Sequence, residues 1–147
     1  MVTLTSLQPA HRLEWLALWN SYLEFYATDL SATITEATFE RLTDPTAQIH
    51  GVIAHDEAGI AVGFVHWHTH PGTWSTKPYC YLEDLFVGSA ARGTGTGRAL
   101  IGHVHEWAQR AGCAKVYWHT QHTNAQARQL YDKVAKHSGE ITYDMAL

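Results

Sequence analysis

The sequence has few charged residues and no excess of positive ones. Asp, Glu, Lys and Arg make up 16% of the 147 residues, which is too little charge for a disordered polyelectrolyte. Ten Lys and Arg stand against fourteen Asp and Glu, so the formal net charge is −4. A protein that binds nucleic acid generally presents a basic surface, and this composition argues against such a partner. It favours a neutral or cationic small molecule instead.

Long apolar runs and cysteines are also scarce. No apolar stretch approaches the ~20 residues that a membrane-spanning helix needs, so we expect no membrane partner. The N-terminal residues lack a basic segment followed by an apolar one, which argues against a signal peptide. Cys80 and Cys113 are the only cysteines, and their spacing matches neither a disulfide framework nor a zinc motif. We therefore expect a protein of the reducing cytoplasm.

Hydrophobic and aromatic residues, in contrast, are plentiful. Hydrophobic residues make up 46% of the chain, which includes six Trp and seven Tyr. A chain of 147 residues is close to one typical domain, and it can bury about two-thirds of its unfolded surface. No repeat, linker or low-complexity tract divides the sequence, so we interpret residues 1–147 as a single domain.

The spacing of apolar residues predicts a mixed α/β fold. The first part of the chain predicts a short strand over Thr3–Leu7, a helix over Pro9–Tyr26 and a second helix that Thr35 caps. Further helices are expected before Gly112 and over Asn124–Lys136. The remaining extended runs are Gly51–His55, Ile60–His70, Tyr79–Val87, Lys115–Thr120 and Ile141–Leu147. Antiparallel pairing first and a strand–helix–strand unit second indicate one sheet of mixed direction.

The most informative segment is glycine-rich and lies between a strand and a helix. Gly88–Gly97 follows the strand Tyr79–Val87, and backbone N–H groups at a helix start attract anions such as a pyrophosphate. A flexible turn is the simplest alternative. A P-loop requires Lys at the position that Thr94 occupies. A dinucleotide-binding fold requires its glycines after the first strand, with an acidic residue further on, and neither is present.

Three motifs together resemble the GNAT family of N-acetyltransferases. Arg92-x-x-Gly95-x-Gly97 resembles that family's acyl-CoA loop, and Tyr81–Val87 resembles the central strand before it. Asn124-Ala125-x-Ala127-x-x-Leu130-Tyr131 resembles its last helix motif. The likeness runs from about Gly51 to Tyr143, and within the family it points to the small histone/polyamine and spermidine/spermine acetyltransferases. One departure is Gly139-Glu140, where many members have Gly-Phe.

This resemblance implies a central mixed sheet flanked by about four helices, with acetyl-CoA as the cofactor and no metal. In such enzymes the pyrophosphate binds to backbone N–H groups of the glycine-rich loop, and pantetheine pairs with the central strand. The residues that the resemblance assigns to acetyl-CoA are Leu85, Phe86, Val87, Arg92, Gly93, Thr94, Gly95, Thr96, Gly97, Arg98 and Asn124. For Asn124, an ordinary role at the start of the helix is an equal alternative.

Two residues are candidates for the chemistry that the resemblance implies. Glu83 is the candidate proton acceptor for the amine, through a water molecule. Asp84 would point to the opposite face of an ideal strand, although a bulge would change this, and it is a candidate substrate-binding residue. Tyr131 occupies the position of the family's general acid, which would protonate the leaving thiolate.

The implied activity is transfer of an acetyl group from acetyl-CoA to a primary amine by direct attack in a ternary complex. A polyamine or another small cationic amine is the expected acceptor. Trp74 would supply an aromatic face for it, and a packing role for Trp74 is an equal alternative. Alternatives are a protein Lys or N-terminus, an amino acid, an aminoglycoside, and a non-catalytic CoA-binding module. A homodimer is also expected. His66, His68 and His70 alternate along one strand. Three roles are open for them: they line the acceptor site, they bind zinc, or they form a plain polar face.

Overall fold

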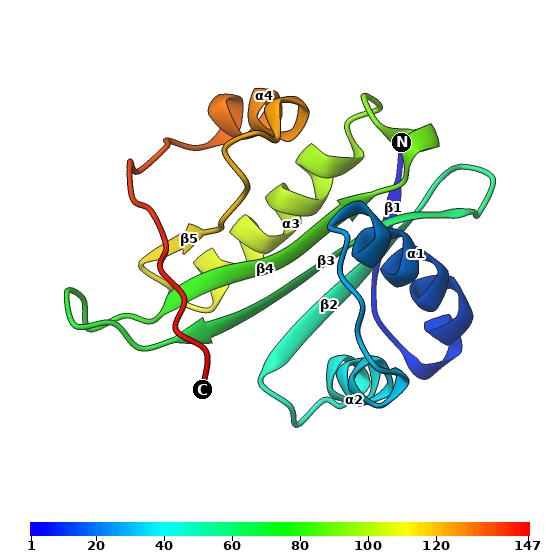
Figure 1. Cartoon of the computed structure of the whole chain (residues 1–147), viewed down its shortest axis with the longest axis horizontal. Coiled ribbons are helices and arrows are strands. Elements are labelled where there is room, and N and C mark those ends of the chain that lie inside the picture. Colours follow the sequence, from blue (N-terminus) through cyan, green and yellow to red (C-terminus); the bar gives the residue numbers. More distant parts are fainter.

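The computed structural model describes residues 1–147, which form one five-stranded mixed sheet with helices on both faces (Figure 1). The strands are β1 (Thr3–Ser6), β2 (Ile49–His55), β3 (Ala61–His70), β4 (Tyr79–Val87) and β5 (Lys115–Tyr117). They lie in the order β1-β2-β3-β4-β5, and only the β4–β5 pair is parallel. The helices are α1 (Arg12–Phe25), α2 (Ala32–Thr43), α3 (Thr96–Arg110) and α4 (Ala125–Val134). The predicted fold class is confirmed.

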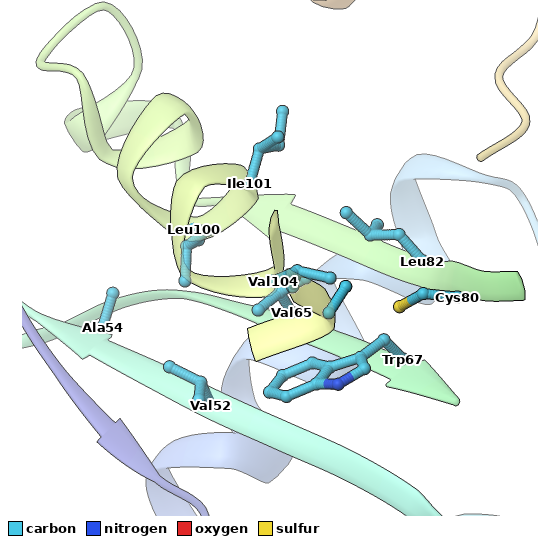
Figure 2. Close-up of a cluster of buried hydrophobic side chains, with 10 residues drawn as sticks. Val52, Ala54, Val65, Trp67, Cys80, Leu82, Leu100, Ile101 and Val104 are labelled. Carbon is cyan, nitrogen blue, oxygen red and sulfur yellow. The ribbon is translucent and has the colours of Figure 1, made fainter. Parts of the chain in front are cut away.

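The central strands bury both of their faces, because side chains alternate along a strand and helices cover each side. In β2, Val52 and Ala54 pack under α3, while Ile53 packs under α1 and α2. Figure 2 shows the cluster beneath α3, where Leu100 and Val104 of the helix meet side chains of β2, β3 and β4. None of the helices combines the length and the apolar character that a membrane span requires.

The two N-terminal helices begin and end close to their predicted positions, with one correction. A 3-10 turn over Pro9–His11 precedes α1, and both lie within the predicted range. The predicted cap of α2 at Thr35 is wrong. Ser31 caps this helix by accepting a hydrogen bond from the Ile34 N–H at 3.3 Å. Thr35 lies inside the helix, where its hydroxyl accepts the indole N–H of Trp19 at 3.2 Å.

The predicted strand at Ile141–Leu147 is also wrong, because these residues form no ladder with any strand. The edge strand β5 is only three residues long, and its outer edge pairs with no strand. Its apolar side chains are exposed, as for Tyr143 at 87%. The fifth strand ends at Tyr117, three residues before the predicted Thr120.

Candidate active site

The glycine-rich segment opens α3 as predicted, and it does so with backbone angles that only glycine adopts readily. Gly93 has φ +78° and Gly95 has φ +92°. Gly95 caps α3, and its carbonyl accepts the N–H of Ala99 at 3.0 Å. The N–H groups before Ala99 therefore have no acceptor within the helix. A Cβ atom at Gly95 would meet no atom within 4 Å, so this end of the helix faces open space.

A groove of about 410 Å³ lies beside this helix start, between the end of β4 and α4, and we call it the glycine-loop groove. β5 stops at Tyr117, opposite Tyr81, so β4 continues towards Val87 without a neighbour on that side. Unpaired strand N–H and C=O groups in a groove need partners, and an extended ligand can supply them. The predicted cofactor residues that line the groove are Leu85, Phe86, Val87, Arg92, Gly93, Gly95, Gly97, Arg98 and Asn124.

Thr94 and Thr96 do not line this groove, although both are predicted cofactor residues. The Thr94 hydroxyl donates to the Ala91 carbonyl at 2.6 Å and contacts the Thr96 hydroxyl at 3.0 Å. Thr96 is 1% exposed. These hydrogen bonds hold the loop in shape.

Two residues of the last helix segment also reach the groove. Asn124 caps α4, because its side-chain oxygen accepts the Ala127 N–H at 3.4 Å, and it lines the groove as well. Tyr131 packs edge-on against Trp118 with 5.5 Å between ring centroids. Burial, with a smaller contribution from Tyr26, raises the pKa of Tyr131 to about 12. Its hydroxyl therefore remains a proton donor at neutral pH.

A β-bulge places Glu83 and Asp84 together. His66 pairs with Asp84 and Trp67 pairs with Leu82, so Glu83 has no partner in the ladder. Both carboxylates line a second cavity of about 540 Å³, which we call the aromatic pocket because Trp19, Tyr22, Tyr26 and Trp67 form much of its wall. The alternation of an ideal strand, which would separate Glu83 from Asp84, is thus broken at this point.

The two cavities adjoin at the bulge. Glu83 and Asp84 line the aromatic pocket, and the next three residues of the same strand line the glycine-loop groove. Tyr26 lines both cavities. A group bound at the end of one cavity therefore lies next to a group bound in the other, which is the arrangement that transfer between two substrates requires.

Asp84 is held by His66, one of the three alternating histidines, and by Tyr22, which the sequence did not single out. The Tyr22 hydroxyl donates to Asp84 Oδ1 at 2.6 Å, and His66 Nδ1 lies 2.9 Å from Asp84 Oδ2. Burial, followed by the charge of Asp84, raises the pKa of Tyr22 well above its usual range. Trp15 Nε1 donates to His66 Nε2 at 3.0 Å. The spacing of Trp15 and Tyr22, two helical turns apart, was the only signal that could have found them.

The three alternating histidines have separate partners. His68 Nε2 lies 3.7 Å from Glu83 Oε2, and both residues line the aromatic pocket. His70 contacts the Tyr117 hydroxyl at 2.6 Å and the carbonyl of Pro71. No group of three or more His, Cys, Asp or Glu side chains lies where it could hold a metal ion.

The structure does not bring Trp74 to either cavity. This side chain lies in the loop between β3 and β4, where it is 95% exposed, and it lines neither the groove nor the pocket. Arg41 of α2 lines the aromatic pocket instead, and it makes no ion pair. Arg41 could not be singled out from the sequence, because an exposed Arg on a helix is ordinary.

Comparison with known proteins assigns this fold to a family. The model of the Acetyltransferase (GNAT) family matches residues 12–135. The chain belongs to the GNAT family. It is an N-acetyltransferase, and this family uses acetyl-CoA as the acetyl donor. The resemblance stated from the sequence is confirmed at the level of the family.

Relatives and solved structures agree with this assignment. The chain is 36% identical over 143 residues to the D-amino-acid N-acetyltransferase HPA3 of Saccharomyces cerevisiae. The aligned region covers 97% of this chain and 89% of that protein. Among solved structures, AAC(6')-Iy in complex with the bisubstrate analogue CoA-S-monomethyl-acetylneamine superposes with a TM-score of 0.85 at 17% identity, over 100% of this chain and 99% of the other. The ribosomal-protein-alanine N-acetyltransferase of Brucella melitensis superposes with a TM-score of 0.79 at 20% sequence identity, and both chains are fully covered.

Proposed function

We propose that this N-acetyltransferase transfers an acetyl group to the primary amine of a small molecule, by direct attack of the amine on acetyl-CoA in a ternary complex. The observation that carries this proposal is the meeting of the two cavities at the bulge of β4. One cavity ends in unpaired helix N–H groups and a strand edge, and the other contains two carboxylates among aromatic rings.

The glycine-loop groove suits acetyl-CoA. The free N–H groups at the start of α3 and the guanidinium groups of Arg92 and Arg98 favour a pyrophosphate. The edge of β4 from Leu85 to Val87 offers hydrogen-bond partners to pantetheine, and a backbone N–H there would polarise the thioester carbonyl. Acetyl-CoA supplies the acetyl group as a thioester.

The reaction needs one group that accepts a proton from the amine and another that donates a proton to the thiolate, and the two cavities offer one each. An amine with a pKa of ~10 is largely protonated at neutral pH, so it must lose a proton before attack. Glu83 takes this proton, through water, and its half-exposed side chain can return the proton to solvent. Tyr131 lines the other cavity and donates a proton or a hydrogen bond to the departing thiolate.

The aromatic pocket recognises a cationic group. Ammonium groups are attracted to carboxylates and to the faces of aromatic rings, and the pocket offers both. A polyamine or a similar small cationic amine fits this chemistry. An amino acid is the second candidate, favoured by the unpaired Arg41 in the same pocket and by the similarity to a D-amino-acid N-acetyltransferase.

A panel of amines tests the proposed function. Release of CoA thiol from acetyl-CoA is measured with polyamines, amino acids, aminoglycosides and a Lys-containing peptide, and the acetylated product is identified by mass spectrometry. We expect turnover with at least one small amine and none with the peptide. Binding of acetyl-CoA without turnover on any amine would indicate a non-catalytic CoA-binding module. Turnover on the peptide alone would indicate a protein acetyltransferase.

Arg41 separates the two candidate acceptors. If an amino acid is the acceptor, Arg41→Gln should raise its KM about tenfold, because the change removes a charge-assisted bond to the carboxylate. The KM of the corresponding amine without a carboxylate should not rise. Arg110→Gln is the matched control, since Arg110 lies at the far end of α3 and lines neither cavity. Equal effects on both acceptors would contradict carboxylate recognition by Arg41.

We also propose that the protein forms a homodimer. The exposed apolar side chains near the C-terminus, including Ile141, Tyr143 and Met145, support this proposal. Light scattering at several protein concentrations decides between a monomer and a dimer.

A further inference from the structure

A chain of hydrogen bonds runs from the core to the wall of the aromatic pocket. Trp15 of α1 is 1% exposed and donates to His66 Nε2 at 3.0 Å. His66 of β3 is 4% exposed, and its Nδ1 lies 2.9 Å from Asp84 Oδ2. Asp84 lines the pocket with a side chain that is 16% exposed. The chain therefore links a fully buried indole to a carboxylate that a ligand can reach.

The indole decides where the ring of His66 carries its proton. An indole N–H donates hydrogen bonds and accepts none, so His66 Nε2 must accept and carries no hydrogen. The ring proton is then on Nδ1, which donates it to Asp84 Oδ2. Phe64 stacks on the imidazole with 4.6 Å between ring centroids, which keeps the ring in this plane.

Asp84 and Glu83 are consequently held in different ways. Both oxygens of Asp84 accept a hydrogen bond, one from His66 and one from the hydroxyl of Tyr22 at 2.6 Å. A carboxylate offers about four acceptor positions, so Asp84 keeps two for a ligand. Glu83 is 48% exposed, and the nearest His68 nitrogen is 3.7 Å away, which is longer than a hydrogen bond.

We infer that Trp15 is a positioning residue that acts through His66: it fixes the Nδ1–H tautomer, and this tautomer holds Asp84 as the anchor for the amino group of the acceptor. Glu83, which remains free to turn towards solvent, is left as the proton acceptor. Two neighbouring carboxylates then have separate roles that their surroundings determine. The inference rests on the proposed function, because it assumes that the aromatic pocket binds an amine.

The tautomer is tested first, on the unmodified protein and without any acceptor. Long-range ¹H–¹⁵N NMR spectra distinguish a ring nitrogen that carries hydrogen from one that does not, and His66→Gln assigns the signals. We expect His66 to show a hydrogen-bearing Nδ1 and a bare Nε2 at neutral pH. A hydrogen on Nε2 would overturn the inference, whatever the activity of the enzyme.

The role of Trp15 is tested with a pair of variants. Trp15→Phe removes the donor to His66 but keeps an aromatic ring, and a hydrogen on Nε2 should then appear in the spectrum because no donor faces that nitrogen. Trp19→Phe is the matched control, because Trp19 lies one turn later, stacks on Trp15 and donates to Thr35 instead of His66. In Trp19→Phe the His66 signals should remain those of the Nδ1–H tautomer.

Kinetics then connect the tautomer to the acceptor. Loss of one oriented hydrogen bond in Trp15→Phe should raise the acceptor KM roughly two- to tenfold and leave the KM of acetyl-CoA unchanged. An unchanged acceptor KM, or an equal rise for acetyl-CoA, would overturn the inference. Absence of turnover with every amine would overturn the proposed function instead, and the spectrum of the unmodified protein would still decide the tautomer.

Discussion

Replacing Tyr131 with Phe should lower kcat about 100-fold and leave acetyl-CoA affinity and thermal stability nearly unchanged. General acids typically contribute ~10²–10⁴-fold, and a thiolate is a good enough leaving group to place this enzyme at the lower end. The change removes one hydroxyl and keeps the ring that packs against Trp118, so little packing is lost. An interaction that forms only in the transition state affects kcat more than substrate binding.

The pH dependence of the same variant adds a second measurement. Burial raises the pKa of Tyr131 to about 12, so its donor form persists to a higher pH than that of an ordinary tyrosine. The defect in kcat should therefore remain constant from about pH 7 to about pH 10. Tyr143→Phe is the control, since Tyr143 is 87% exposed and lines neither cavity. If the chemical step limits the rate and the kcat of Tyr131→Phe equals that of the unmodified protein, Tyr131 is excluded from the mechanism.

The fold could be predicted from the sequence where one periodicity persisted over a long segment. α1, α3 and β3 have long repeats of apolar residues and lie where the patterns placed them. The predicted strand at Ile141–Leu147 had the right composition, but a strand forms only beside a partner, and pairing is not a property of one segment. The cap of α2 was misplaced because Ser31 and Thr35 are equally suitable by residue type.

The candidate site, like the fold, could be predicted from the sequence only in part. Nine of the eleven residues that the resemblance assigned to acetyl-CoA line the glycine-loop groove, because glycines at a strand–helix junction report backbone geometry directly, and their role in binding stays a prediction. The bulge at Glu83 depends on the register between β3 and β4, which the sequence of β4 alone does not encode. Trp15 and Tyr22 lie in the predicted helix Pro9–Tyr26 but were not singled out, since their partners His66 and Asp84 lie on other elements.

Replacing Gly95 with Val should remove most of the affinity for acetyl-CoA. Gly95 has φ +92°, and a β-branched residue rarely adopts this conformation, so the start of α3 must shift. The new side chain would also occupy the open space in front of the free N–H groups. Loss of one or two bonds to a charged pyrophosphate corresponds to roughly 10- to 100-fold weaker binding. Calorimetric titration with acetyl-CoA measures this change.

Gly59→Val is the control that separates backbone strain from loss of the ligand. Gly59 has φ +77°, and a side chain there would also meet no atom within 4 Å, but it lies in the turn between β2 and β3 and lines neither cavity. Both variants should lose stability by about 1–3 kcal/mol from strain alone.

A thousandfold excess of acetyl-CoA over its Kd should then restore about 4 kcal/mol to Gly59→Val. At the same acetyl-CoA concentration Gly95→Val should recover far less, because its Kd is higher. Equal recovery in the two variants would show that the pyrophosphate does not bind at this loop.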